Sequence, residues 1–324
     1  MAHMIDFSRG YAAIAYSGEK PWHNLGFELP KGKSLEVWCE KAGLDWEAKQ
    51  APVAWVDEKK VMHESASDIV LYRSDTKDQL SVVGKDFKVV QPKAVIEFFR
   101  ELVEDNGGFH MEVAGSLDGG RKVWALARRE GEIRIMGQDL LLPYLLLATG
   151  LDGSMKTTAQ FTTVRVVCNN TLQASLGEKS VGSVRVSHRS LFDQDAVKAQ
   201  LGLKADDAFK AFEEETARMA KKKISREDAV SIFVRALAGD GDVDLDDKDL
   251  QRKVGTLLSA YEKGPGSDLK SAKGTAWGVM NAVTFVTDHA ARARSGNNRL
   301  RDAWFGRGAD LKARVSGILM AEAA

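Results

Sequence analysis

A run of strand-like segments separated by sharp reversals, residues 109–168, is the feature that most constrains the fold of this chain. Asp118-Gly-Gly120 lies between two such segments and is typical of a tight hairpin, because aspartate and glycine tolerate the positive φ angles of these turns. Gly137-Gln-Asp139 and Leu151-Asp-Gly-Ser154 supply two further reversals. The pattern predicts an antiparallel meander of three or four strands that ends in the polar run Arg165-Val-Val-Cys-Asn-Asn-Thr171.

Shorter segments on both sides of the meander have patterns of their own. Residues 68–72, 79–83 and 87–90 are rich in β-branched and aromatic side chains, which predicts three strands. Proline at a first helical turn, followed by apolar residues at helical spacing, predicts a helix over residues 92–104. Directly after the meander we expect a short helix over residues 170–176.

The last third of the chain has a helical period. Ser225-x-x-Asp228 matches a capping box, and further helices are predicted over residues 247–263, 274–292 and 308–322. The predicted fold class is therefore α+β, with an antiparallel β-meander packed on helices and a helical C-terminal region. The predicted domains are a loop-rich, tryptophan-containing N-terminal arm (5–60), an α+β core with the meander (61–189) and the helical region (190–324).

Composition excludes several classes of protein. The chain is 44% hydrophobic and 28% charged, which is typical of a globular protein. Cys39 and Cys168 are the only cysteines, so neither a disulfide framework nor a zinc site is predicted, and a reducing, cytoplasmic location is expected. The longest apolar run, Leu140–Leu147, contains Pro143 and is too short to cross a membrane, so we expect it to be a buried strand.

Motifs for catalysis fail on spacing. Gly32-Lys-Ser34 resembles the end of a phosphate-binding loop, but Phe27 stands where the loop needs glycine. Cys168, Asn169 and His188 could form a nucleophile and base of a hydrolase or transferase, although a buried, unreactive cysteine is the favoured interpretation. The sequence therefore predicts a protein that is not an enzyme and that needs no cofactor or metal.

Charge is balanced overall but unevenly distributed. The chain has 46 basic and 46 acidic residues, yet the stretch from Ser154 to Arg189 holds five basic residues against Glu178 alone. Strand alternation within that stretch predicts one face with Lys156, Thr158, Gln160 and Thr162, and another with Thr157, Ala159, Phe161, Thr163 and Arg165. Such faces could bind phosphate and stack a base, or could be an ordinary half-solvated sheet surface.

Four of the seven tryptophans lie in the N-terminal arm, at positions 22, 38, 46 and 55. We expect these rings to pack the arm onto the core. A stacking platform for bases and a contact surface for another protein are the alternatives.

Several short motifs together resemble the phage- and plasmid-related DUF932 family. They span nearly the whole chain and comprise Trp22-His-Asn-Leu-Gly26, Val83–Gln91, Gly119-Gly-Arg121, Asp152-Gly-Ser154, Arg165–Thr171, Trp277-Gly-x-x-Asn-Ala-Val-Thr284, Asp288-His289, Phe305-Gly306 and Lys312. The resemblance implies a protein of mobile genetic elements and brings no established activity with it.

The meander, with its preceding and following helices, is similar in outline to the core of Rad52-like single-strand annealing proteins. That similarity implies a basic groove for the DNA backbone, a ring or filament, and no need for ATP or metal. The residues that it implies for phosphate binding are Lys85, Lys88, Lys156, Arg165, Arg185 and Arg189.

Two functions from different classes follow. The first is a phage- or plasmid-derived protein that binds and anneals single-stranded DNA in recombination, with single-stranded DNA and further copies of itself as partners and no membrane contact. The second is a phage structural or host-interaction protein without enzymatic activity, whose tryptophan-rich arm contacts an unknown partner.

Overall fold

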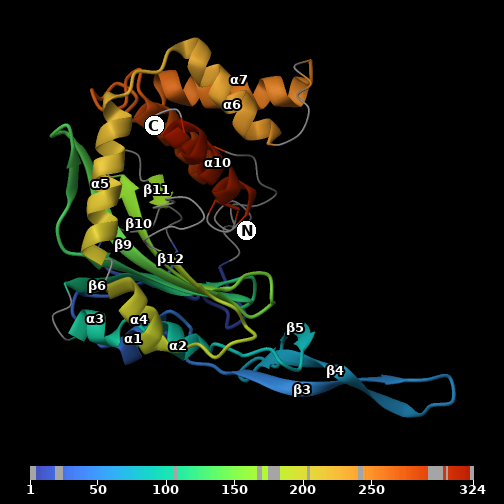
Figure 1. The fold of residues 1–324 in the computed structure, drawn as a ribbon. Coiled ribbons are helices and arrows are strands. Elements are labelled where there is room, and N and C mark those ends of the chain that lie inside the picture. Colours follow the sequence, from blue (N-terminus) through green and yellow to red (C-terminus); the bar gives the residue numbers. More distant parts are fainter. Residues whose placement is uncertain are drawn as a thin grey trace. The chain divides into compact units, whose positions relative to one another are not determined.

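The computed structural model describes residues 5–18, 25–104, 108–165, 170–173, 183–202, 205–239, 244, 246–290, 302–303 and 306–321. Packing divides the chain into two compact units, and each is assembled from separate stretches of sequence. The first unit comprises 1–130, 145–160 and 183–201, and the second comprises 131–144, 161–182 and 202–324. The fold class is α+β, as predicted (Figure 1). The three consecutive domains predicted from the sequence stay a prediction.

One large, mostly antiparallel sheet contains the meander. Its strands are hydrogen-bonded in the order β11-β10-β9-β7-β6-β1-β2, with β12 paired to β10 and β8 to β9. The bounds are β1 Ile14–Tyr16, β2 Phe27–Glu28, β6 Phe109–Leu117, β7 Lys122–Arg129, β8 Ile133–Ile135, β9 Asp139–Gly150, β10 Thr157–Arg165, β11 Asn170–Gln173 and β12 Ser183–Val186. Asp118 and Gly119 both have positive φ angles between β6 and β7, which confirms the predicted hairpin.

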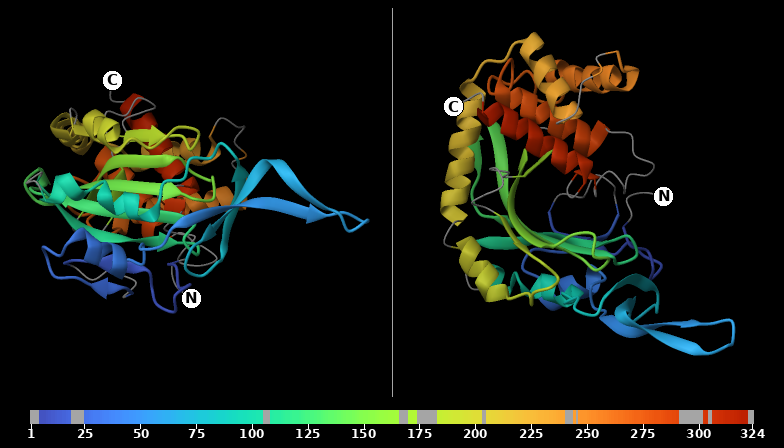
Figure 2. Two further views of the ribbon diagram at one scale, coloured as in Figure 1. Left: turned by 90° about the horizontal axis from the view of Figure 1, so that it is seen from below. Right: turned by 45° about the vertical axis from the view of Figure 1, so that its right-hand side comes forward.

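Four helices of the first unit lie on one side of its part of the sheet. They are α1 Leu35–Lys41, α2 Pro92–Glu97, α3 Arg100–Glu104 and α4 Gln194–Gly202, and Figure 2 shows them on one side of the strands. Val95, Ile96, Phe98 and Phe99 are fully buried there. These side chains recur at helical spacing, so they form one apolar face along α2 and the two residues that follow it. Burial of that face stabilises this segment.

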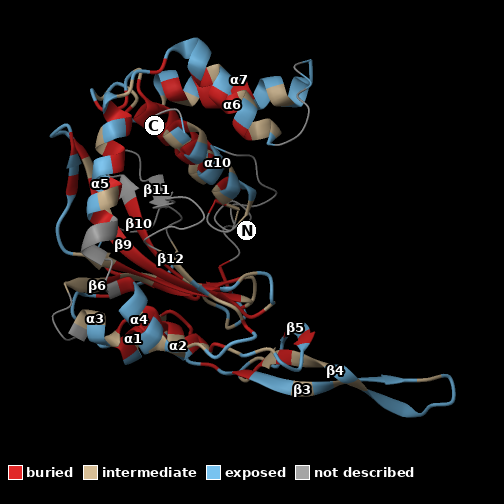
Figure 3. Ribbon diagram, in the orientation of Figure 1, coloured by how far each residue is buried: buried red, intermediate tan, exposed pale blue. Residues whose placement is uncertain are grey.

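A second sheet of three strands forms an arm. Its strands are β3 Ala48–Val56, β4 Met62–Arg73 and β5 Gln79–Gly84, in the order β3-β4-β5. Figure 1 shows β3 and β4 running together beyond the end of β5, away from α1 and α2. Figure 3 shows that the far part of this ribbon is exposed to solvent.

Buried charged residues hold the end of the three-stranded sheet that is nearest the helices. Arg73, the last residue of β4, is fully buried, and its guanidinium donates to the carboxylates of Asp6 and Asp75. The same group lies 4.3 Å from the ring of Trp46. Gly120 makes this packing possible, since a Cβ atom there would lie 2.8 Å from Nη1 of Arg73. Burial opposes ionisation of Asp6, but hydrogen bonds from Ser8 and Arg73 keep its pKa below the usual value.

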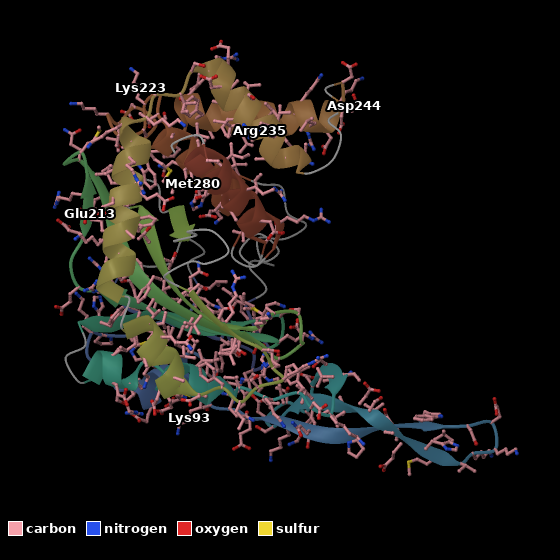
Figure 4. All side chains as sticks on the ribbon, in the orientation of Figure 1. Lys93, Glu213, Lys223, Arg235, Asp244 and Met280 are labelled. Carbon is pink, nitrogen blue, oxygen red and sulfur yellow. The ribbon has the colours of Figure 1, made fainter. Side chains whose placement is uncertain are left out.

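Helices dominate the second unit. They are α5 Ala205–Lys221, α6 Arg226–Ala238, α7 Lys248–Lys263, α8 Ala276–Phe285, the π-helix η1 Val286–Ala290 and α10 Arg307–Ala321. The side chain of Ser225 accepts from the N–H of Asp228, and the carboxylate of Asp228 accepts from the N–H of Ser225, which confirms the capping box. Helix α8 is buried from Ala276 to Thr284 and packs against α5, α7 and α10. Met280, labelled in Figure 4, lies in this core.

Polar groups inside the second unit are paired across elements. The carboxylate of Asp139 accepts from the hydroxyl of Ser271 at 2.7 Å and from the indole N–H of Trp277 at 2.9 Å. The ammonium of Lys312, which is 2% exposed, donates to Asp288 at 2.8 Å. Because a buried charge or hydrogen-bonding group is costly when unpaired, these pairs fix the positions of α8, η1 and α10.

Three sequence predictions need correction. The meander has five strands, because residues 133–135 pair with 139–141 around the turn at Met136 and Gly137. Residues 170–173 form strand β11 instead of a helix, since they pair with 162–165; residues 174–176 lie outside the described residues. Residues 87–90 are irregular, because the N–H of Lys88 donates to the carbonyl of His188 at 2.6 Å instead of to a neighbouring strand.

Leu140–Leu147 lies within β9 and is largely buried, as expected. Among the described residues, none of the helices is long and apolar enough to cross a membrane.

The first testable prediction concerns the buried carboxyl group of Glu215 in α5. Burial raises its pKa from 4.5 to about 7, and Arg218 offsets only part of this. The unfolded chain therefore ionises first as pH rises between about 4.5 and about 7, so the stability of the fold falls across that window, by up to about 3 kcal/mol. Glu215→Gln should unfold with a higher free energy than the natural protein near about pH 8 and with a similar one near about pH 5.

Chemical denaturation at the two pH values measures this difference. Glu213→Gln is the matched control, because Glu213 lies two residues away on the same helix and is exposed (Figure 4). An equal effect of both substitutions at high pH would show that the burial of Glu215 does not cost stability.

Candidate nucleic-acid interface

Three segments that are distant in sequence meet at His188 in the first unit. The ring nitrogen Nδ1 of His188 lies 3.0 Å from the carbonyl oxygen of Lys88, and Nε2 lies 3.1 Å from that of Met155. The ring also stacks on Phe87, with 4.3 Å between centroids and 12° between planes. A neutral imidazole can donate to one of these carbonyls and an imidazolium to both. His188 therefore joins the segment after β5, the turn before β10 and the turn after β12.

Five of the six residues predicted to bind phosphate lie on these three segments or, in the case of Arg185, in the adjoining strand β12. All five are exposed, and they are Lys85, Lys88, Lys156, Arg185 and Arg189. Thr158 of β10 is directly opposite Arg185 of β12, so the two side chains share a face of the sheet. Lys156 precedes Thr158 by two residues and follows the same alternation. We call these five residues the basic cluster.

The cations of the basic cluster are not neutralised by ion pairs within the described part of the chain. Other cations of the same unit differ: Lys122 is buried and bound to Asp152 at 2.7 Å. Asp86 is exposed between two of the lysines, and Asp68 has its pKa lowered by hydrogen bonds from Ser67 and Ser65, with a smaller contribution from Lys85. The patch keeps a net positive charge that faces water.

The sixth predicted residue, Arg165, ends β10. Its backbone pairs with Asn170 of β11, whereas its side chain lies outside the described residues. Its predicted contact with phosphate stays a prediction.

The expected polar surface along β10 is mostly buried. Gln160 and Thr162 on one face, and Thr163 on the other, are each less than 9% exposed. Phe161 is 1% exposed and packs edge-on against Phe209 at 4.7 Å, so it cannot stack a base. Neither alternative for this strand, a phosphate-binding face or a half-solvated sheet face, holds along residues 160–163, because the side chains on both faces are buried. Only its start belongs to the interface.

The tryptophans of the N-terminal arm divide into two groups. Trp38 and Trp46 are each 2% exposed, which confirms the predicted packing role for these two. Trp55 is 54% exposed near the end of the β3–β4 ribbon, and that prediction is wrong for it. Trp22 lies outside the described residues.

The catalytic alternative gains nothing from the structure. His188 is held by two backbone carbonyls, and Cys168 lies outside the described residues. Cys39 is buried, and burial raises the pKa of its thiol to about 11, which disfavours the reactive thiolate. Within the described ranges, no group of His, Cys, Asp and Glu side chains is arranged to hold a metal ion.

Comparison with known proteins establishes the family. The model of the family described as "Domain of unknown function (DUF932)" matches residues 79–304, which is more than half of the chain. The chain belongs to this family. No curated protein and no solved structure matches it.

Two motifs of the family resemblance contribute to the basic cluster. Val83–Gln91 carries Lys85 and Lys88, and Asp152-Gly-Ser154 forms the turn that precedes Lys156. His188 itself was missed as a positioning residue, because nothing in its own sequence neighbourhood shows which carbonyls it will contact.

His188 should contribute strongly to the stability of the first unit. His188→Ala removes the hydrogen bond that the ring donates to a backbone carbonyl and the ring stacked on Phe87, so we expect the free energy of unfolding to fall by about 1 to 3 kcal/mol. Denaturant unfolding measures the change. His63→Ala is the control, since His63 is on the exposed ribbon and should cost less than about 1 kcal/mol. Equal losses in both variants would contradict the joining role of His188.

Proposed function

We propose that this protein binds single-stranded DNA through the phosphates and anneals complementary strands as an oligomer, without ATP or a metal. The observation that carries the proposal is the basic cluster, where exposed cations from three distant segments converge around His188. Exposed cations with few acidic neighbours are the side chains that bind a nucleic-acid backbone without reading its sequence.

The likeness in outline to Rad52-like annealing proteins supports the same proposal. A strand meander beside the α2–α3 helical segment is present, and the cluster lies where the chain enters β10. Contact limited to the backbone would leave bases open for pairing, which annealing requires. A phage or plasmid origin and a role in recombination belong to this proposal.

Salt dependence of binding tests the proposal directly. We expect a labelled single strand to bind at low salt, with the logarithm of affinity falling linearly with the logarithm of salt concentration, by about 0.7 per phosphate contact. Fluorescence anisotropy across a salt series measures this slope. The double variant Lys88→Glu with Arg189→Glu should bind more weakly and have a slope shallower by about 1.4.

A matched control uses exposed lysines outside the basic cluster. Lys59 and Lys60 lie in the turn between β3 and β4, so reversal of both should leave the slope unchanged. Absence of binding at low salt would exclude the proposal. Equal weakening by the two double variants would exclude the basic cluster as the interface.

One observation favours the second function, a structural or host-interaction protein without enzymatic activity. The outer β3–β4 ribbon exposes Trp55, an aromatic residue of the kind that is enriched in protein interfaces. Under this alternative, Trp55→Ser would abolish partner binding, and reversal of charge in the basic cluster would have no effect on it.

A further inference from the structure

The contacts of the His188 ring fit an imidazolium better than a neutral imidazole. Nδ1 lies 3.0 Å from the carbonyl oxygen of Lys88, and Nε2 lies 3.1 Å from that of Met155. A backbone carbonyl oxygen can only accept a hydrogen bond, so each contact needs an N–H group on the ring. A neutral imidazole has a single N–H, and its other nitrogen would turn a lone pair toward an oxygen. A second proton converts that unfavourable contact into a hydrogen bond.

The surroundings of the ring support the same protonation state. The ring of Phe87 lies parallel to that of His188, with 4.3 Å between centroids, and an aromatic face attracts a cation placed over it. The backbone N–H of Lys88 donates to the carbonyl of His188 at 2.6 Å, so these two residues are joined through backbone as well as side chain. Because His188 is only 9% exposed, water has little access to either ring nitrogen. The two carbonyls are therefore the partners that the ring nitrogens have.

Positive charges near His188 oppose this second proton in the protein without DNA. An exposed cation stands at each of the three contacting positions or directly after it, namely Lys88, Lys156 and Arg189. The carboxylates on the same segments are Asp86, Asp152 and Asp193. Of these, Asp152 is paired with Lys122, and Asp193 accepts from N–H groups in the first turn of α4. Because like charges disfavour a further positive charge, the basic cluster works against the proton that the two carbonyls favour.

We propose that His188 takes up a proton when the basic cluster binds a phosphate backbone, so that the affinity for single-stranded DNA rises as pH falls. This inference rests on the proposed DNA binding and adds a pH-dependent regulation of the same site. Bound phosphates neutralise the cations of the cluster, which removes the opposition to an imidazolium. The proton then makes hydrogen bonds of both carbonyl contacts and joins the three segments more firmly. Binding and protonation favour each other, as thermodynamic linkage requires.

The pH dependence of binding is the first test. We expect the affinity for oligothymidylate to rise as pH is lowered from about 8 to about 6, by at most about tenfold per pH unit for one proton. Oligothymidylate is the probe because thymine does not ionise in this range, so the DNA contributes no titration of its own. Fluorescence anisotropy at constant ionic strength measures the affinity, since salt changes it independently.

Proton uptake by the natural protein is a second test and needs no substitution. Isothermal titration calorimetry with oligothymidylate near about pH 7, in buffers of different ionisation enthalpy, gives the number of protons taken up on binding. We expect net uptake of at most about one proton. Binding with the expected salt slope but without proton uptake would overturn this inference and leave the proposed function standing. Absence of binding at every pH would overturn both.

Two variants assign the proton to His188. His188→Gln and His188→Asn each retain an amide N–H that can donate to one of the two carbonyls, and neither side chain titrates. We expect both variants to lose the proton uptake and the pH dependence of binding. His63→Gln is the matched control, because His63 lies on the exposed ribbon, and it should keep both. Unchanged uptake in the two His188 variants would overturn the inference. Should either variant fail to fold, the uptake by the natural protein still decides the outcome.

Discussion

The arrangement of the first unit depends on the ion pairs of the buried Arg73 guanidinium. Its two carboxylate partners, Asp6 and Asp75, come from the N-terminal segment and from the turn after β4, and Trp46 covers its face. A buried cation is tolerated only when its hydrogen bonds are satisfied, so removal of one partner would leave an uncompensated charge. The network therefore holds the N-terminal segment, the arm and the β6–β7 turn in one arrangement.

Two exposed surfaces of different chemistry lie on either side of Arg73 along the chain. Beyond Arg73, toward residues 54–64, the ribbon has only two strands and exposes apolar groups. Through β5, in the other direction, the chain reaches Lys85 and Lys88, where His188 fastens it to the start of β10. The exposed cations and the exposed apolar residues thus lie on separate parts of one unit.

The sequence was sufficient to predict features that depend only on residues close together in the chain. Asp118-Gly-Gly120 adopts the hairpin, and Ser225 with Asp228 forms the capping box, because each depends on residues a few positions apart. Predictions failed for segments whose conformation depends on a hydrogen-bonding partner that is distant in the sequence. Asn170–Gln173 became a strand because β10 offered an edge, and the segment around Lys88 left its strand pattern to bond with His188. Trp55 is exposed, although its large aromatic ring led us to expect packing on the core. The reason is that the β3–β4 ribbon extends beyond the end of β5.

The sequence by itself determined the α+β class, the meander, the helical last third, the family and the identity of the cations in the candidate interface. Only the tertiary structure decided that the segments carrying those cations meet at His188 and that the five cations are exposed. It also decided that most of the β10 surface is core and that Trp55 is exposed to solvent. The physical reason is that the residues that favour a turn, and the spacing of apolar residues that favours a strand or helix, determine structure over only a few positions. Convergence at His188 depends instead on hydrogen bonds between groups 33 and 100 residues apart.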